Sequence, residues 1–155
     1  MSAPLDDLYQ SLILDHNRRP RNLGPLEDAN RTARGRNPLC GDECTLWLRV
    51  DGETIADVRF VGTGCAISKA SASVLTTVVK GKTTAEAGEL FERFHALVTG
   101  RPVEGAELPR SLAAFAGVAR FPMRVKCASM AWHALRSALA GSPAPDLPAP
   151  TPPTP

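Results

Sequence analysis

The chain has 155 residues, a length that fits one compact domain with its own core. Its formal charge is +2 at pH 7, which is too small to argue by itself for a nucleic-acid or membrane partner. No run of about 18 apolar residues occurs, so no membrane span is expected. The first ten residues, MSAPLDDLYQ, have no basic region and no long apolar stretch, so the sequence predicts a cytoplasmic protein without a secretory signal.

An amphipathic helix is predicted over residues 5–16, with Pro4 in its first turn. The residues with helical spacing are Leu5, Leu8, Tyr9, Leu12, Ile13 and His16. A histidine on an apolar face is more often a packed, hydrogen-bonded residue than a metal ligand, so a packing role is favoured for His16. Residues 18–38 hold three prolines and two glycines, and this composition indicates a loop.

A β-hairpin is expected next. Leu46, Leu48 and Val50 alternate with more polar positions, and the same alternation returns over 56–60. The Asp51-Gly52 dipeptide between them is a two-residue turn signal. Two strands alone are marginally stable, so helices or another strand must cover one face of the hairpin.

Helices dominate the second half of the chain. A helix is predicted over 68–80, with Gly81 at its C-terminal end. The Thr83-x-x-Glu86 pattern is typical of a capping box and opens a helix that Gly100 closes.

A short helix is expected over 108–118, inside an inserted segment, and Phe121-Pro122 opens the last helix. Residues 142–155 read SPAPDLPAPTPPTP, and such proline density predicts an extended, disordered tail. The order of elements predicts an α+β fold, a small antiparallel sheet covered by helices, with one domain over 1–141 and the tail over 142–155.

The four cysteines are the residues that carry chemistry: Cys40, Cys44, Cys65 and Cys127. In a reducing compartment, cysteines more often bind metal, react or pack than form disulfides. Cys40 and Asp42 flank Gly41, and in an extended segment their side chains would point the same way, with Cα atoms about 7 Å apart.

Cys65 directly precedes a predicted helix, whose N-terminal dipole favours thiolate, and Cys127 lies in the second turn of the last helix. Three thiols and the Asp42 carboxylate make a complete tetrahedral set for zinc. A carboxylate is a harder ligand than a thiolate, which suggests a site from which one ligand can leave. The spacing leaves open that Asp42 is only a turn residue. It also leaves open whether Arg124, one turn before Cys127, stabilises a thiolate or bound sulfur or is simply solvated.

Four blocks of the sequence resemble one family: LDDLYQSLILDHNRRPRNLG, NPLCGDECTLWL, GTGCAISKASASVL and FPMRVKCASMAWHAL. Together they look like the SufU proteins, within the wider group of IscU-like and NifU-N-like iron–sulfur assembly proteins, and the resemblance covers about residues 5–140. It implies the α+β fold of that group. It also implies one zinc ion, held by Cys40, Asp42, Cys65 and Cys127.

The resemblance further implies an activity, that of a sulfurtransferase which activates a cysteine desulfurase. SufU-type proteins accept persulfide sulfur from a pyridoxal-phosphate-dependent cysteine desulfurase, SufS, for downstream Suf cluster-assembly scaffold proteins. By this resemblance the acceptor is Cys40. A histidine of the desulfurase takes the place of Cys40 on zinc and frees its thiolate. Arg124 matches an arginine that assists near the site.

Two alternatives stay open: an IscU-like scaffold for [2Fe–2S] cluster assembly and transfer, and a non-catalytic zinc-folded adaptor. IscU-like proteins carry a histidine just before their third cysteine, where this chain has Lys126, and SufU-like proteins have an insertion resembling residues 99–120. Cys44 departs from the family pattern, which is usually apolar there. Packing is favoured for it over a spare ligand or a resolving thiol.

Six arginines gather in or near the predicted loop: Arg18, Arg19, Arg21, Arg31, Arg34 and Arg36. They form either a solvated loop or a docking face for an acidic partner. No aromatic residues are interleaved with them, so nucleic acid is not an expected ligand.

Overall fold

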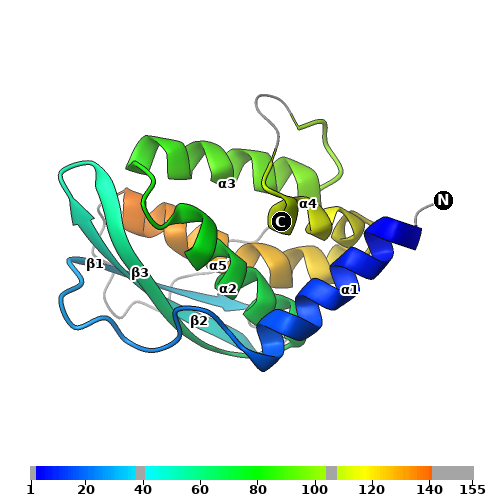
Figure 1. The fold of residues 1–155 in the computed structure, drawn as a ribbon, viewed down its shortest axis with the longest axis horizontal. Helices are drawn as coiled ribbons and strands as arrows, with labels where there is room; N and C mark the ends of the chain where they lie inside the picture. Colours follow the sequence, from blue (N-terminus) through cyan, green and yellow to red (C-terminus); the bar gives the residue numbers. More distant parts are fainter. Residues whose placement is uncertain (1–2, 38–40, 104–107, 141–155) are drawn as a thin grey trace.

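The computed structural model describes residues 3–37, 41–103 and 108–140, which fold into a three-stranded sheet and surrounding helices (Figure 1). The elements in chain order are α1 (Ala3–Arg18), β1 (Arg31–Asn37), β2 (Asp42–Asp51), β3 (Thr54–Thr63), α2 (Ala66–Val79), α3 (Thr84–Val98), α4 (Arg110–Ala113), the 3₁₀ helix η1 (Ala114–Arg120) and α5 (Pro122–Leu139). The expected α+β class, with a small antiparallel sheet covered by helices, is confirmed. No helix in the described ranges is long and apolar enough to cross a bilayer.

The sheet has the order β1-β2-β3 with antiparallel pairs throughout, so it contains one strand more than the predicted hairpin. The loop predicted over 18–38 is wrong for residues 31–37, which form β1 and pair with β2. Its sequence, RTARGRN, lacks the alternating large apolar residues that indicate a strand, because the positions facing the helices are small or polar. A Cβ on Gly35 would lie 2.9 Å from the Met130 carbonyl oxygen of α5, so the close approach of that helix excludes a larger side chain.

The β2–β3 hairpin is confirmed, with its turn shifted by one residue from the prediction. Asp51 pairs with Thr54, so the two loop residues are Gly52 and Glu53. Gly52 has φ of +63°, in the left-handed region that glycine adopts without steric cost. The inward side chains of β2 alternate strictly with exposed or half-exposed ones, as the apolar pattern indicated.

Two helices cover the inner face of the sheet. α5 packs on β1 and β2, α2 packs on β3 and on α5, and α1 lies against α2, while α3 and η1 pack on α5 (Figure 1). An aromatic group anchors these layers: Phe94 of α3 stacks on Trp132 of α5 with centroids 4.8 Å apart and meets Phe115 of η1 edge-on at 5.6 Å. The same layers bring the N-terminal ends of α2 and α5 close to the start of β2.

Local sequence signals predicted several helix ends. The capping box is confirmed, since Thr83 Oγ1 accepts from the Glu86 amide at 3.0 Å and Glu86 Oε1 accepts from the Thr83 amide at 2.9 Å. α2 begins at Ala66, two residues before the prediction, and α5 begins at Pro122 as expected. The short helix expected over 108–118 is present as α4 and η1. The predicted tail over 142–155 lies outside the described residues.

Candidate metal centre

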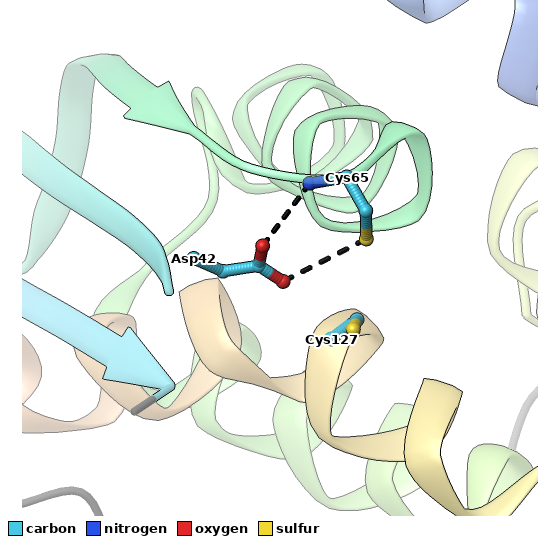
Figure 2. A group of neighbouring side chains, drawn as sticks. All are labelled: Asp42, Cys65 and Cys127. Atoms are coloured by element: carbon cyan, nitrogen blue, oxygen red, sulfur yellow. Dashed lines mark hydrogen bonds between the residues drawn. The ribbon is translucent and has the colours of Figure 1, made fainter. Parts of the chain in front are cut away.

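Three side chains that the sequence proposed as metal ligands meet where β2, α2 and α5 converge. Asp42 is the first residue of β2, Cys65 directly precedes α2, and Cys127 lies in the second turn of α5. One ligand atom from each lies within 4.8 Å of the other two (Figure 2). Cys40, the fourth predicted ligand, lies outside the described residues.

The Asp42 carboxylate is held in place by the residues that lead into α2. It is 1% exposed, and its Oδ1 accepts a hydrogen bond from the Cys65 backbone N–H at 3.1 Å. The Cys65 sulfur lies 3.6 Å from its Oδ2 and donates to it when protonated. A buried carboxylate needs such donors, so Asp42 is a fixed part of this junction and more than a turn residue.

Gly64 makes this arrangement sterically possible. Its φ is +141°, and a Cβ built there would overlap Asp42 Oδ1 and lie 2.7 Å from Asp42 Cγ. Glycine is therefore required both for the backbone conformation and for the approach of the carboxylate. The sequence showed a glycine beside Cys65, but only the fold shows which side chain occupies the space.

Cys65 is the N-cap of α2, and its half-buried sulfur accepts a hydrogen bond from the Ser68 backbone N–H at 3.5 Å. A hydrogen bond from the Cys127 thiol lowers the pKa of Cys65 to about 6, with a further contribution from Ser68 and an opposing one from burial. Cys65 is thus the more acidic member of the pair, as its place at a helix N-terminus predicted.

Cys127 is 2% exposed, and its thiol donates to the Met123 carbonyl oxygen at 3.7 Å. Its hydrogen bond to Cys65 raises the pKa of Cys127 above its usual range, and burial raises it further. In the absence of a cation Cys65 therefore loses its proton more readily than Cys127, which keeps its own. A metal ion that replaced this proton would keep both sulfurs as thiolates.

The donor set fits zinc. In a tetrahedral zinc site with bond lengths of about 2.3 Å to sulfur and 2.0 Å to oxygen, adjacent sulfur and oxygen ligands lie about 3.5 Å apart. The Cys65 Sγ to Asp42 Oδ2 separation is 3.6 Å, close to that value, and all three ligand atoms lie within 4.8 Å of one another. Two thiolates and one carboxylate supply three of four ligands and favour zinc or iron over the hard cations magnesium and calcium.

The remaining cysteine that the structure describes, Cys44, lies outside this group. It is 3% exposed on the inner face of β2, between Gly35 of β1 and Gly62 of β3, and burial raises its pKa to about 12. The expectation that it packs as a small apolar side chain is confirmed, because it belongs to the buried hydrophobic core.

Arg124 is exposed in the first turn of α5, three residues before Cys127. Its charge also acts on Tyr9 of α1. Burial raises the pKa of Tyr9, and the positive charge of Arg124 opposes that rise. The charges of Cys65 and Cys127 raise the pKa of Tyr9 further. The sequence did not single out Tyr9 as a neighbour of the cysteines. Its ring meets Phe115 edge-on with centroids 6.0 Å apart, a contact between segments far apart in sequence.

The histidines and several of the clustered arginines have structural partners. His16 is 7% exposed and its Nδ1 lies 2.7 Å from Ser73 Oγ, which confirms its predicted packing role. Arg21 pairs with Asp15 at 2.6 Å, and Arg31 donates to the Ala138 carbonyl at 2.9 Å. His95 and His133 contact the Phe91 ring. Arg18, Arg19, Arg34 and Arg36 are exposed, and Arg19 lies 3.7 Å from Asp15 in a surface ion pair. The docking face for an acidic partner stays a prediction.

Comparison with known proteins places most of the chain in one family. Residues 8–144 match the NifU-like N terminal domain. The chain is 38% identical over 139 residues to the zinc-dependent sulfurtransferase SufU of Bacillus subtilis (strain 168), covering 90% of this chain and 94% of that protein. It is 38% identical over 137 residues to the iron–sulfur cluster assembly scaffold protein IscU of Streptococcus pyogenes serotype M1, covering 88% and 86%.

A solved structure agrees with the sequence comparison. The crystal structure of an iron–sulfur cluster assembly scaffold protein for the SUF system from Fervidobacterium islandicum AW-1 superposes with a TM-score of 0.80 at 37% identity. The match covers 86% of this chain and 97% of that one.

Proposed function

Since this chain belongs to the family of NifU-like N-terminal domains, as its four sequence blocks indicated, we propose that it is a zinc-dependent sulfur carrier of the SufU type that serves iron–sulfur cluster assembly. The observation that supports this function is the meeting of Asp42, Cys65 and Cys127, with ligand atoms within 4.8 Å of one another. The similarity to a relative named a zinc-dependent sulfurtransferase, over 90% of this chain, supports the same function.

Zinc would be held by these three residues and by Cys40, two positions before Asp42. Bound zinc would keep the thiols deprotonated and shield them from oxidation until a partner arrives. Asp42 is the hard ligand in a soft set, so the site binds less firmly than four thiolates would. A less firm site suits a centre in which one cysteine has to leave the ligand set and react.

The reacting group is the Cys40 thiolate, and its donor is the persulfide of a SufS-type, pyridoxal-phosphate-dependent cysteine desulfurase. The thiolate attacks the terminal sulfur of that persulfide and forms a new S–S bond. The S–S bond within the desulfurase persulfide breaks, and its electron pair stays on the desulfurase cysteine as a thiolate. The sulfur therefore moves without net oxidation, and downstream Suf scaffold proteins are its recipients.

Arg124 is proposed to assist this transfer by charge. Its exposed position in the first turn of α5 lets its guanidinium meet a partner's persulfide. A cation beside sulfur anions favours the thiolate and the anionic persulfide over their protonated forms.

The test is the steady-state turnover of the cognate cysteine desulfurase, measured with and without the zinc-loaded protein. We expect a large rise with the intact protein, because an acceptor relieves slow persulfide release. The rise should vanish with Cys40→Ala and remain with Cys44→Ala, the matched control at a buried cysteine. Full activation by Cys40→Ala would remove that residue as the acceptor.

A second candidate is a scaffold on which a [2Fe–2S] cluster is assembled, since a relative of equal identity is named an IscU scaffold. The same thiols can bind iron. Lys126 stands where IscU-like proteins carry a histidine, which disfavours this function. A cluster that forms on the chain and transfers intact to an apo-protein, with no effect on desulfurase turnover, would favour the scaffold.

A further inference from the structure

Ser68 contacts the Cys65 sulfur through two of its own groups. Its backbone N–H donates to Cys65 Sγ at 3.5 Å, and its Oγ lies 3.8 Å from the same sulfur. The hydroxyl also donates to the Cys65 carbonyl oxygen at 3.1 Å. Ser68 is 3% exposed, so its own side of these contacts is buried, while Cys65 is half-buried.

The direction of the hydroxyl contact depends on the state of the sulfur. With Cys65 as a thiol, its single S–H has two acceptors within reach, Asp42 Oδ2 and the Ser68 oxygen, and the hydroxyl hydrogen goes to the Cys65 carbonyl. A metal-bound thiolate has no hydrogen to donate and becomes a charged acceptor. A serine hydroxyl rotates to suit its neighbours, and a charged acceptor binds it more strongly than a carbonyl does.

We propose that Ser68 is a positioning residue that keeps Cys65 a permanent ligand: its hydroxyl and amide both donate to the metal-bound thiolate and lower its nucleophilicity. Sulfur transfer is thereby directed away from Cys65 to another cysteine of the site. This inference rests on the proposed metal-binding function. It adds a reason why thiols that share one metal ion differ in reactivity.

The test compares Ser68→Ala with two controls. Ser68→Thr keeps the hydroxyl, and Ser129→Ala removes a hydroxyl of equal burial, 3% exposed, which donates at 2.7 Å to the Val125 carbonyl within α5. Alanine is the best helix former, so these small replacements should fold. Circular dichroism checks this.

Two readouts report on the sulfur itself. The first is the thiolate-to-metal charge-transfer band of the cobalt(II)-substituted protein. The second is the alkylation rate of Cys65 by iodoacetamide in the zinc-loaded protein, followed by mass mapping of peptides. A lost hydrogen bond makes the sulfur a stronger donor, so in Ser68→Ala the band should move to lower energy and alkylation should rise about five-fold or more. Ser68→Thr and Ser129→Ala should match the wild-type protein.

The outcomes separate this inference from the proposed function. If Ser68→Ala matches Ser129→Ala in both readouts, the role of Ser68 is overturned. If the wild-type protein gives no thiolate band with cobalt and retains no zinc, the metal-binding function itself fails. If Ser68→Ala does not fold, heteronuclear NMR of the cadmium-loaded wild-type protein replaces it: scalar coupling between the metal and the Ser68 protons supports the inference, and its absence contradicts it.

Discussion

Two regions of this molecule present cysteines in opposite environments. In the interior of the sheet, Cys44 lies between glycines of both neighbouring strands, and burial raises its pKa to about 12. At the junction of β2, α2 and α5, Cys65 receives hydrogen bonds at a helix N-terminus, and its pKa is lowered to about 6. The comparison teaches that two causes set thiol chemistry here: burial raises the pKa of Cys44, whereas hydrogen bonds at a half-buried position lower the pKa of Cys65.

The largest difference should appear in the reactivity of the metal-free protein. The thiolate of Cys65 forms as the pH rises through about 6, so alkylation of Cys65 should be half-maximal near that pH. Cys44, with a pKa of about 12, is thiolate in only about one molecule in 10⁴ at pH 8. Mass mapping after iodoacetamide treatment in a chelator should show Cys65 modified and Cys44 intact, with fragmentation of the peptide of residues 37–49 to separate Cys44 from Cys40. Equal modification of both cysteines in the folded protein would contradict the difference in their reactivity.

Metal binding should separate the same two cysteines. Cys65→Ala removes a ligand, and even the loss of a supporting hydrogen bond at a metal site typically costs 10–100-fold in affinity, so zinc affinity should fall by about 100-fold or more. Cys44→Ala leaves the donor group unchanged and should keep one zinc per chain. Competition with a chromophoric chelator measures both, and zinc loss in Cys44→Ala alone would reverse the assignment.

The glycines sharpen the comparison further. In Gly64→Ala a Cβ would collide with the Asp42 carboxylate at a φ of +141°, whereas Gly81, at a φ of +86°, has open space around it. Strain at positive φ costs about 1 kcal/mol, and overpacking adds about 2 kcal/mol. Urea unfolding should therefore show a loss of about 3 kcal/mol for Gly64→Ala and about 1 kcal/mol for Gly81→Ala. Equal losses would mean that the carboxylate moves aside freely.

The smallest expected effect concerns His16, which is buried against Ser73 of α2. Burial lowers the pKa of His16 below its ordinary value of 6.5, so below pH 6.5 the unfolded chain binds a proton that the folded chain excludes. The stability from this residue is complete above about pH 6.5 and declines as the pH falls. Between pH 7.5 and 5.5 the metal-free wild-type protein should lose up to about 1 kcal/mol more than His16→Asn. Parallel pH profiles of the two proteins would contradict this role.

The elements with strong local patterns were predictable from the sequence. The alternation around Leu46 and the capping box at Thr83 report local geometry, and the structure agrees with both. β1 was missed because its inner positions are small, and that smallness reflects the packing of α5 on Gly35, a contact distant in sequence. The turn moved by one residue because glycine takes the first loop position.

At the site, residue types and the family resemblance pointed to Asp42, Cys65 and Cys127, and the fold brings them together. The sequence could not show that Gly64 makes room for the carboxylate. Ser68 was open to prediction as the third helical residue after an N-cap, whose amide commonly bonds to the cap side chain. Its hydroxyl contact depends on the rotamers of both residues and needed the structure.

The most direct test of the central claim is to locate the transferred sulfur. The zinc-loaded protein is incubated with a SufS-type cysteine desulfurase and cysteine, and its cysteine peptides are then weighed by mass spectrometry without reduction. We expect the mass of additional sulfur on Cys40 and none on Cys44 or Cys65; Cys40 and Cys44 share the tryptic peptide of residues 37–49, so cleavage after Glu43 or fragmentation of that peptide separates them. Sulfur on Cys65, or no sulfur on any peptide while desulfurase turnover stays unchanged, would contradict the account.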